Sequence, residues 1–445
     1  MKKSRCFVLI VFLVLGFSQW GYAQRYKLRK GQKYEKVKFE LINNLIVIPL
    51  EVNGTTLSFV MDSGVSTPIL FNLANQDSIQ LKNVSEITIH GLGKGEPISA
   101  LSSLGNYFKL GNVRNFSQKL YVVMDTEINF SPSLGVPIHG IIGYDLFKDF
   151  VVDINYANKT MKFFDPDTYD RRPSKKARTL PISIAGRKAY MDANIALKDN
   201  SEIKVKMLLD TGSSDAIWLF ENEQIRLPQK NYEDFLGKGL AGDIYGRRTK
   251  INKLRIGDFI LDDAKTAFPD MLTFNTIKDL GNRNGSLGGE VLKRFNIIFD
   301  YPHGKITLKK NTNFKKPFQY NVSGIDLQHA GMRYISEQIE SPNTVVSKEG
   351  RLYGDVQIIL EGATRLSLVP EIVVSAIRVG SPAHSSGLRE GDVILAVDGK
   401  RIHRYKLQEI MHMLNSKKEG KRVKVLVERY NRDLLFSFIL KDLFK

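Results

Sequence analysis

Two stretches of the chain place a carboxylate in the same setting, a tight turn at the end of an apolar strand. Residues 207–219 read MLLDTGSSDAIWL, and residues 57–70 read LSFVMDSGVSTPIL. In both, apolar residues lead into Asp-Thr/Ser-Gly, a serine follows four residues after the Asp, and apolar residues return. Asp210 and Asp62 therefore hold equivalent positions. Two carboxylates that face each other can share one proton, and such a pair acts as general acid and general base in one site.

The second copy is what favours chemistry over a structural role. Gly212 lacks a Cβ, so another backbone can approach it closely, and the hydroxyls of Ser213 and Ser214 can bond neighbouring backbone groups. Taken alone, an Asp in such a turn is a structural Asx-turn about as often as a catalytic group. A repeated turn can be brought opposite its copy by a pseudo-twofold axis, and this predicts a site between two halves.

Further landmarks repeat along the chain and predict an internal duplication. Residues 139–163 and 285–308 have the same order of buried strand, helical turn, strand, turn and strand. Four pairs of residues in these segments are separated by a constant 145 positions, close to the 148 between the aspartates: Gly140 and Gly285, Gly143 and Gly288, Phe150 and Phe295, Tyr156 and Tyr301. A repeat of this kind indicates two units of one design.

Short alternating strands separated by glycine-rich turns predict a mainly β chain. Asn53-Gly54 is a hairpin signal, and the glycine-rich loops at 91–95 and 237–246 lie between strand-like runs. We predict two homologous β-barrel lobes followed by a smaller domain. The expected ranges are a signal peptide at 1–23, lobe 1 at 24–168, a linker at 169–178, lobe 2 at 179–316, and a last domain at 317–445 with an insertion around 339–369.

Composition limits the partners and the chemistry. The formal charge of the 445 residues is +18, and removing the three basic residues of the leader leaves +15, spread over linkers and loops. This favours a solvated basic surface over nucleic-acid or membrane binding.

The N-terminal segments are read separately. Residues 25–36 are basic and polar and are predicted to be a mobile segment before the first lobe. Residues 1–23 have a basic start, a short apolar run and a small-x-small end, as expected of a removable Sec signal. The sole cysteine, Cys6, lies in that leader, so the mature chain has no disulfide and no thiolate site.

The aspartate motifs and their partners resemble those of the retroviral- and pepsin-type aspartic peptidases. Asp62-Ser63-Gly64 occurs with Ile141-Ile142-Gly143, and Asp210-Thr211-Gly212 occurs with Leu287-Gly288. The resemblance covers about residues 38–308. It implies that each Asp turn is threaded beneath its hydrophobic-Gly strand and that each lobe gives one catalytic aspartate, Asp62 and Asp210.

The same resemblance implies roles for the residues beside each aspartate. Ser63 and Thr211 would cross-brace the two turns through their hydroxyls, and Ser66 and Ser214 would bond the outer oxygens of the aspartates. Two departures from the family pattern occur. Ser286 stands where the first lobe has an isoleucine, and Tyr245 is only a candidate for the aromatic residue of a flap.

The last part of the chain contains four glycine-containing motifs: Gly380-Ser381-Pro382-Ala383, Gly387-Leu388, Gly391-Asp392-Val393-Ile394 and Asp398-Gly399. With these motifs, residues 372–440 resemble a PDZ domain of the bacterial envelope-protease type. In that family a peptide C-terminus adds as a strand beside a helix, which is expected here at 407–415, and backbone N–H groups of a loop hold its carboxylate. Ser323, Gly324 and Ile325 would form that loop. The alternative is a PDZ fold that only packs on the protease.

Other chemistries find no support in the sequence. Residues 237–242 fit GxGxxG, but strand-like basic sequence follows instead of the helix that a dinucleotide site needs. The seven histidines show no HExxH spacing, and GxSxG does not occur. We therefore expect no cofactor and no metal.

Three functional hypotheses remain open. The first is a secreted, periplasmic or cell-envelope aspartic endopeptidase of a Gram-negative bacterium, acting on peptides or unfolded proteins, with a PDZ domain that recruits substrate or partner C-termini. The second is a non-catalytic peptide-binding protein of the envelope that uses the same lobes. In the third, the dyad forms between two chains. None has a nucleic-acid partner or an integral membrane segment after signal removal.

Overall fold

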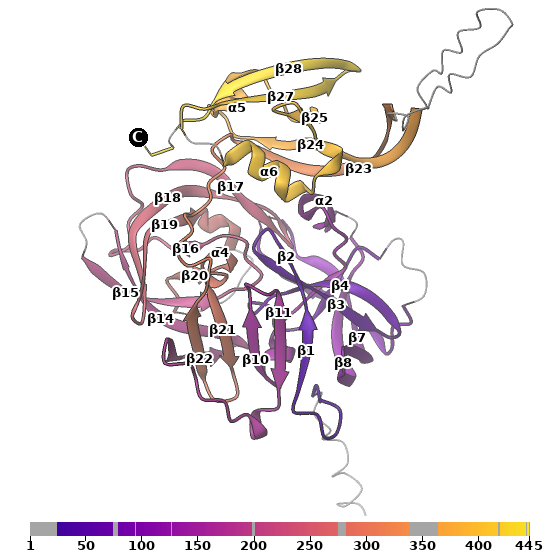
Figure 1. Ribbon diagram of the computed structural model, residues 1–445. Coiled ribbons are helices and arrows are strands. Elements are labelled where there is room, and N and C mark those ends of the chain that lie inside the picture. Colours follow the sequence, from indigo (N-terminus) through magenta and orange to yellow (C-terminus); the bar gives the residue numbers. More distant parts are fainter. Residues whose placement is uncertain are drawn as a thin grey trace, which may run out of the picture. The chain divides into compact units, whose positions relative to one another are not determined.

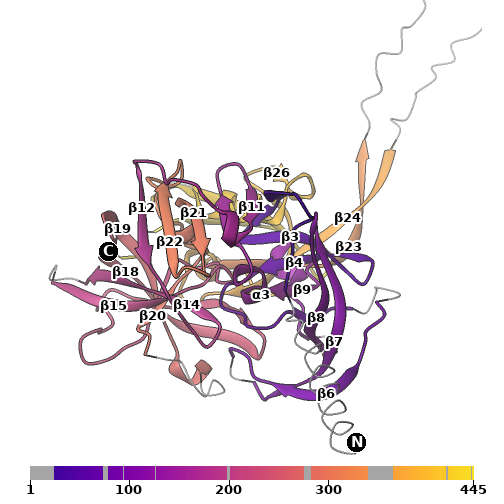
Figure 2. The same ribbon diagram turned by 90° about the horizontal axis from the view of Figure 1, so that it is seen from below.

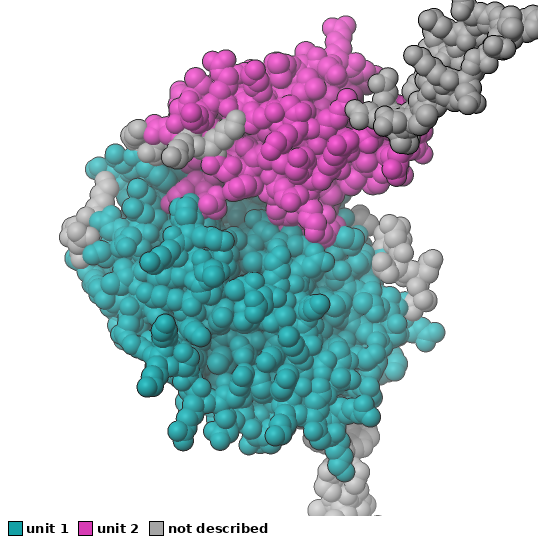
Figure 3. All heavy atoms as spheres, viewed as in Figure 1, with its two compact units in different colours: residues 1–130, 137–318, 444–445 teal, residues 131–136, 319–443 magenta. Residues whose placement is uncertain are grey.

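The computed structural model describes residues 25–73, 79–93, 95–125, 127–197, 201–274, 282–338, 364–416, 419–441 and 443–444. These residues form two compact units, which Figure 3 shows in two colours. The first contains the described residues of Met1–Phe130, Pro137–Phe318 and Phe444–Lys445, and the second those of Ser131–Val136 and Gln319–Leu443. The predicted signal peptide lies outside the described residues.

The prediction of a mainly β chain is confirmed (Figure 1). The longest helix of the described residues is α6 (Leu407–Asn415), which has the predicted bounds and buries Leu407, Ile410 and Leu414. Among the described residues, no helix combines the length and the apolar character needed to cross a membrane.

Lobe 1 is an eight-stranded sheet with the order β2-β3-β4-β9-β5-β8-β7-β6, closed by a pairing of β3 with β7. The Asn53-Gly54 turn joins β3 to β4, and both residues have positive φ (48° and 93°), as a two-residue type I′ turn requires. The strands are β2 (Glu40–Ile42), β3 (Leu45–Val52), β4 (Thr55–Met61), β5 (Ile69–Leu70), β6 (Val84–Ile89), β7 (Ile98–Leu110), β8 (Val113–Val123) and β9 (Gly140–Ile142).

Lobe 2 is a second eight-stranded sheet with the equivalent order β13-β14-β15-β20-β16-β19-β18-β17, closed by a pairing of β14 with β18. Figure 2 shows its strands on one side of the first unit and those of lobe 1 on the other. The strands are β13 (Ser183–Ala185), β14 (Lys188–Ala196), β15 (Glu202–Leu209), β16 (Ile217–Leu219), β17 (Tyr232–Gly239), β18 (Gly242–Ile256), β19 (Phe259–Pro269) and β20 (Gly285–Leu287).

A third sheet joins the lobes and was not predicted. Its order is β1-β11-β10-β21-β22-β12, and β10 pairs with β21 across the two halves. The prediction that residues 25–36 form a mobile segment is therefore wrong, because β1 pairs with β11 and Tyr26 is 3% exposed. The strands are β1 (Tyr34–Lys38), β10 (Val151–Asn155), β11 (Thr160–Phe164), β12 (Ala177–Pro181), β21 (Phe295–Asp300) and β22 (Lys305–Lys310).

The second unit has one sheet, ordered β23-β24-β25-β27-β28, with β26 paired to β25. Residues 364–369 of the predicted insertion belong to β24 and pair with β23, because the hairpin is longer than its alternation suggested; the remainder, 339–363, lies outside the described residues. The elements are β23 (Ile325–Gln338), β24 (Thr364–Ile377), α5 (Pro382–Ser385), β25 (Val393–Val397), β26 (Lys400–Arg401), β27 (Arg422–Arg429) and β28 (Arg432–Ile439).

Candidate active site

Each aspartate follows a strand that lies parallel to the strand of a hydrophobic-Gly motif. β4 pairs with β9 and β15 pairs with β20, both in parallel. The N–H of Asp62 donates to the carbonyl oxygen of Ile142 (2.8 Å), and that of Asp210 donates to that of Leu287 (3.0 Å). A Cβ on Gly143 would lie 1.8 Å from the carbonyl oxygen of Asp62, so only glycine permits this threading.

The tertiary structure brings Asp62 and Asp210 together. Each carboxyl group lies beside the glycine of the opposite turn. The carboxyl group of Asp62 lies against Gly212, where a Cβ would be 2.1 Å from Cγ, and Oδ1 of Asp210 would be 3.5 Å from a Cβ on Gly64. The residual exposure of both aspartates shows that solvent reaches them. A carboxyl pair of this kind, enclosed but accessible, can hold one proton between its members.

The pKa values of the pair are shifted upward. Burial, and then the neighbouring carboxylate of Asp210, raise the pKa of Asp62 from 3.8 to about 7. Burial also raises the pKa of Asp210, but the charge of Arg283 and the N–H of Gly212 act in the opposite direction. Since two adjacent carboxylates cannot both ionise cheaply, the pair keeps one shared proton up to near-neutral pH.

Ser63 and Thr211 form a reciprocal brace between the two turns. The N–H of Ser63 donates to Oγ1 of Thr211 (2.9 Å), and the N–H of Thr211 donates to Oγ of Ser63 (3.0 Å). The hydroxyls then donate to the opposite strand ends, Ser63 to the carbonyl oxygen of Leu209 and Thr211 to that of Met61, both at 2.7 Å. Both side chains are buried, so these four bonds hold the turns in register.

Ser66 and Ser214 are placed differently from the expectation. The hydroxyl of Ser66 donates to the carbonyl oxygen of Gly186 (3.5 Å), and the contact of Ser214 is through its backbone oxygen, which accepts from Nδ2 of Asn44 (2.7 Å). Among the described residues, neither hydroxyl donates to an aspartate. Oδ1 of each aspartate accepts instead a backbone N–H, from Gly64 (2.7 Å) and from Gly212 (3.1 Å).

Hairpin turns from each lobe contact the aspartate turn of the other, and sequence reasoning missed them. Asn44, in the turn between β2 and β3, accepts a hydrogen bond from Nζ of Lys293 (2.6 Å) and donates to Ser214. Gly186, in the turn between β13 and β14, accepts from Ser66. The positive φ of Asn44 (69°) is compatible with a turn, but no local pattern identifies a partner 170 residues away.

The two glycine-rich hairpins meet tip to tip. The N–H of Ala241 donates to the carbonyl oxygen of Leu92 (2.9 Å), and the N–H of Gly95 donates to that of Ala241 (2.7 Å). A Cβ on Gly93 would lie 2.2 Å from the Ala241 carbonyl. Tyr245, the candidate flap residue, is 43% exposed on β18. Glycine is needed here because two backbones approach each other directly.

In the second unit, Ser323 and Gly324 directly precede β23, and Ile325 is its first residue. Their backbone N–H groups donate to side-chain oxygens of Asn415 (2.9 Å), Asn321 (3.0 Å) and Ser323 itself (3.3 Å). A peptide carboxylate bound there would have to replace these acceptors. The carboxylate-binding role of the loop therefore stays a prediction.

A piece of chain from between β8 and β9 packs on this same unit. α2 (Ser131–Leu134) lies beside β23, and Nε2 of Gln408 donates to the carbonyl oxygen of Leu134 (2.7 Å). Leu134 is 6% and Leu407 3% exposed. β23 is an edge strand of its sheet, the kind of edge to which a peptide adds. A peptide that adds beside α6 would therefore meet this segment.

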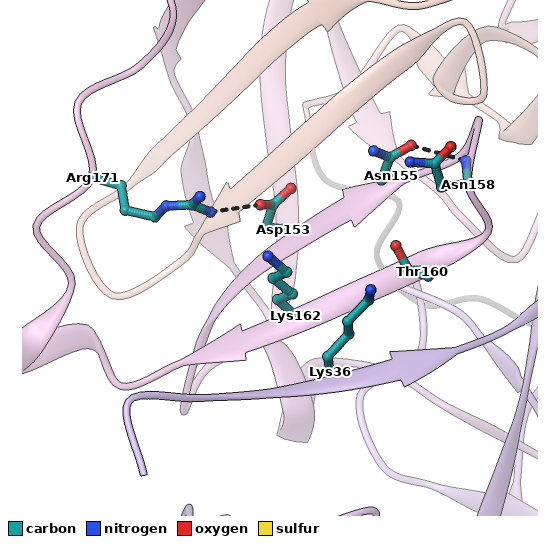
Figure 4. A pocket seen from close by; sticks show the side chains of 7 residues that line it. All are labelled: Lys36, Asp153, Asn155, Asn158, Thr160, Lys162 and Arg171. Atoms are coloured by element: carbon teal, nitrogen blue, oxygen red, sulfur yellow. Dashed lines mark hydrogen bonds and ion pairs between the residues drawn. The ribbon is translucent and has the colours of Figure 1, made fainter.

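A separate cavity of about 270 Å³ lies on the six-stranded sheet, away from the aspartates (Figure 4). Asp153 lies among cations there, and Nη1 of Arg171 is 3.2 Å from its Oδ2. Its carboxylate is thus already paired, and we assign no chemistry to this cavity. Among the described residues, no group of three His, Cys, Asp or Glu side chains could hold a metal ion.

Comparison with known families supports both assignments at a coarse level. Residues 48–146, which include the Asp62 turn and Gly143, match the family model of an aspartyl protease. Residues 344–440 match the family model of a PDZ domain. No curated protein matches the chain. The chain therefore contains an aspartyl protease-like domain followed by a C-terminal PDZ domain.

Proposed function

We propose that the chain is an aspartic endopeptidase that hydrolyses peptide bonds with the Asp62–Asp210 dyad. The observation that carries the proposal is the position of the two carboxyl groups, one from each lobe, each beside the glycine of the opposite turn. The brace of Ser63 and Thr211 supports it, because it holds the turns at a fixed separation without using either carboxylate. A purely binding protein would have no need for this arrangement.

The chemistry follows from one shared proton. The ionised carboxyl group removes a proton from a water molecule bound between the pair, and that water attacks the scissile carbonyl carbon. The protonated carboxyl group donates a hydrogen bond to the carbonyl oxygen and then supports protonation of the leaving nitrogen. We propose that the two hairpin tips, which contact each other through Leu92 and Ala241, cover the dyad and exclude bulk water from the reacting atoms.

The test is cleavage of an unfolded protein from pH 3 to pH 8. We expect Asp62→Asn and Asp210→Asn each to lower the rate by on the order of 10²–10⁴-fold, because either change removes the shared proton. Asp263→Asn, an exposed surface aspartate of lobe 2, is the matched control and should match wild type. Equal cleavage by wild type and Asp210→Asn would overturn the proposal, and tight peptide binding without turnover would favour the non-catalytic alternative.

A mixing experiment separates a dyad within one chain from a dyad between chains. Asp62→Asn and Asp210→Asn variants are combined in equal amounts and assayed together. A dyad formed within one chain predicts no recovery, because every chain lacks one carboxylate. Recovery of a quarter or more of the wild-type rate would mean that two chains share the site.

The PDZ domain extends the proposal to recruitment. We propose that it binds an extended peptide along the edge of β23, beside α6. Such a peptide must displace the contacts made by Ser131–Val136. Weakening these contacts with Gln408→Ala should therefore tighten peptide binding, as measured by fluorescence anisotropy with the full chain; unchanged affinity would contradict competition.

We further propose secretion by the Sec route to the periplasm or cell envelope, on the basis of the leader at residues 1–23. Expression of the full chain in a Gram-negative host, followed by mass measurement of the product, tests it. A mature protein that starts near residue 24 in the periplasmic fraction is expected. A full-length cytoplasmic product would contradict the proposal.

A further inference from the structure

Arg283 lies next to the aspartate site on a firmly held stretch of backbone. It immediately precedes Asn284, whose N–H donates to the carbonyl oxygen of Lys206 and whose own carbonyl oxygen accepts from the N–H of Phe220, both at 2.8 Å. The side chain of Asn284 accepts a further bond from the N–H of Lys206 (2.8 Å). The following strand, β20, runs beside β15, which leads to Asp210.

Among the residues that the structure describes, the guanidinium of Arg283 has no ion-pair partner. It lies over the ring of Phe220, 5.4 Å from the centroid, and its Nε is buried without a hydrogen-bond partner. A buried donor without a partner is costly, and Arg283 as a whole is only partly buried, so a ligand can reach its guanidinium. An anion from outside the chain would complete this site.

The charge of Arg283 affects the ionisation of Asp210. It is the strongest of the influences that oppose the raised pKa of Asp210. Lys188, at the start of β14, acts in the same direction on both aspartates. The lobe 2 side of the dyad is therefore electropositive, although Asp210 itself is not an ion-pair partner of Arg283.

Lobe 1 lacks this charge at the equivalent position. A shift of 145 residues from Arg283 leads to Ile138, an apolar residue that is fully buried. The contacts of the neighbouring residue are the same. Nδ1 of His139 accepts from the N–H of Ser58 (3.1 Å), as Oδ1 of Asn284 accepts from that of Lys206, and the N–H of His139 donates to the carbonyl oxygen of Ser58 (2.8 Å). One scaffold thus carries a fully buried apolar side chain in lobe 1 and a partly exposed cation in lobe 2, so the surroundings of the two aspartates differ in charge.

We propose that Arg283 binds a carboxylate of the substrate next to the scissile bond, so that the enzyme prefers peptides with an acidic residue at one position. This inference rests on the proposed peptidase function. A planar guanidinium suits the task because it can donate two parallel hydrogen bonds to a carboxylate. A residue that only tuned Asp210 would not need a buried donor, Nε, without a hydrogen-bond partner.

Matched peptides test the proposal. A single cleavable sequence is made with Glu or Gln at each of eight positions around the cleaved bond, all with amidated C-termini, and one Gln peptide is also made with a free C-terminus. Wild type should favour Glu over Gln at one position by roughly 10- to 100-fold in kcat/KM, as expected of a charge-assisted pair. The free-acid peptide shows whether a terminal carboxylate serves equally well.

Arg283→Gln should reduce that Glu/Gln ratio to near one, and Arg283→Lys should keep part of it. Arg226→Gln, a change of an exposed arginine of lobe 2, is the control and should leave the ratio as in wild type. An unchanged ratio in Arg283→Gln with a shifted pH profile would mean that Arg283 only tunes Asp210, and the inference would be overturned. The absence of any Glu preference in wild type would overturn it as well.

A binding measurement distinguishes failure of this inference from failure of the proposed peptidase function. The peptides are titrated into Asp62→Asn with and without Arg283→Gln, and affinity is measured without turnover. If wild type cleaves nothing, the proposed function fails, but loss of Glu-selective binding in the double variant still supports the inference. Equal affinities for Glu and Gln peptides in Asp62→Asn overturn it.

Discussion

The two lobes share one strand order, but their buried polar groups have different kinds of hydrogen-bond and ion-pair partners. In lobe 2, Arg248 is 8% exposed and contacts two carboxylates, Asp215 through Nη1 (2.9 Å) and Asp234 through Nε (2.6 Å). Lys265 joins Asp215 (3.3 Å) to Glu290. Lobe 2 is therefore organised around a network of buried charges.

Lobe 1 uses neutral amides in the corresponding region. Asn115 donates to Gln118 (2.8 Å), and Gln118 donates to Asp145 (2.7 Å), which also pairs with Lys148 (3.0 Å). Asp145 and Glu290 lie 145 residues apart, so they are equivalent in the sequence. The fold thus accepts amides or ions, provided that each buried polar group finds a partner. Because its network consists of buried ion pairs, the stability of lobe 2 should be more sensitive than that of lobe 1 to the loss of one member.

The largest expected difference follows from removing one member of each network. Arg248→Met leaves Asp215 and Asp234 buried without a cation and should lower the free energy of unfolding at pH 7 by about 3–5 kcal/mol. Gln118→Leu leaves one amide unpaired while Asp145 keeps Lys148, and should cost about 1–3 kcal/mol. Urea unfolding measures both. Equal losses would remove the distinction between the lobes.

The cost of Arg248→Met should depend on pH. Arg248 and Lys265 hold the pKa of Asp215 well below its usual range despite burial. A depressed carboxyl pKa stabilises the fold above the unfolded pKa of about 4 and loses that effect as pH falls through the folded value. Without Arg248 the carboxylates can take up protons in acid, so the deficit measured at pH 7 should shrink at pH 3. A constant deficit would contradict this.

The pH dependence of stability should have the opposite sign for the Asp62–Asp210 pair. Because the folded pKa of Asp62 is raised to about 7, its ionisation destabilises the fold as pH rises from about 4 to 7. Asp62→Asn should therefore be more stable than wild type by on the order of 2–4 kcal/mol at pH 8 and nearly equal to it at pH 4, in thermal or urea unfolding. Wild-type activity should fall above pH 7, where the shared proton is lost. A variant less stable than wild type at pH 8 would contradict the upward shift.

The reciprocal brace predicts equal effects from the two lobes. Ser63→Ala and Thr211→Val each remove two buried hydrogen bonds, and each should lower the free energy of unfolding by about 1–3 kcal/mol. Thr211→Ser, which keeps the hydroxyl, is the control and should stay near wild type. Losses that differ by more than about 1 kcal/mol would show that one lobe depends on the brace more than the other.

The hairpin tips give the smallest expected effect. Gly93 and Gly237 have similar positive φ values, 136° and 144°, but only Gly93 has a neighbour, the Ala241 carbonyl, where a Cβ would lie. Gly93→Ala should lower kcat/KM by about 3- to 10-fold, or roughly 1 kcal/mol, through loss of the tip contact. Gly237→Ala carries the same backbone strain and should change kcat/KM less than twofold. Equal losses would mean that backbone strain alone is responsible.

The sequence by itself determined the local chemistry of the site. The motifs around Asp62 and Asp210 predicted two equivalent turns, and the glycines that permit threading were recognisable because only glycine allows such close backbone contact. The alternation of apolar residues predicted a mainly β fold, and helix 407–415 was predicted with its observed bounds. Each of these inferences uses interactions between residues close in sequence.

Only the tertiary structure decided which distant groups meet. The pairing of β10 with β21, the contact of Asn44 with Ser214, and the position of Arg283 beside the dyad all join residues more than 70 positions apart. Ser66 contacts Gly186 and Ser214 contacts Asn44, while backbone N–H groups of Gly64 and Gly212 bond Oδ1 of the aspartates. Strand register and cross-lobe packing set such contacts, and no pattern of neighbouring residues encodes them.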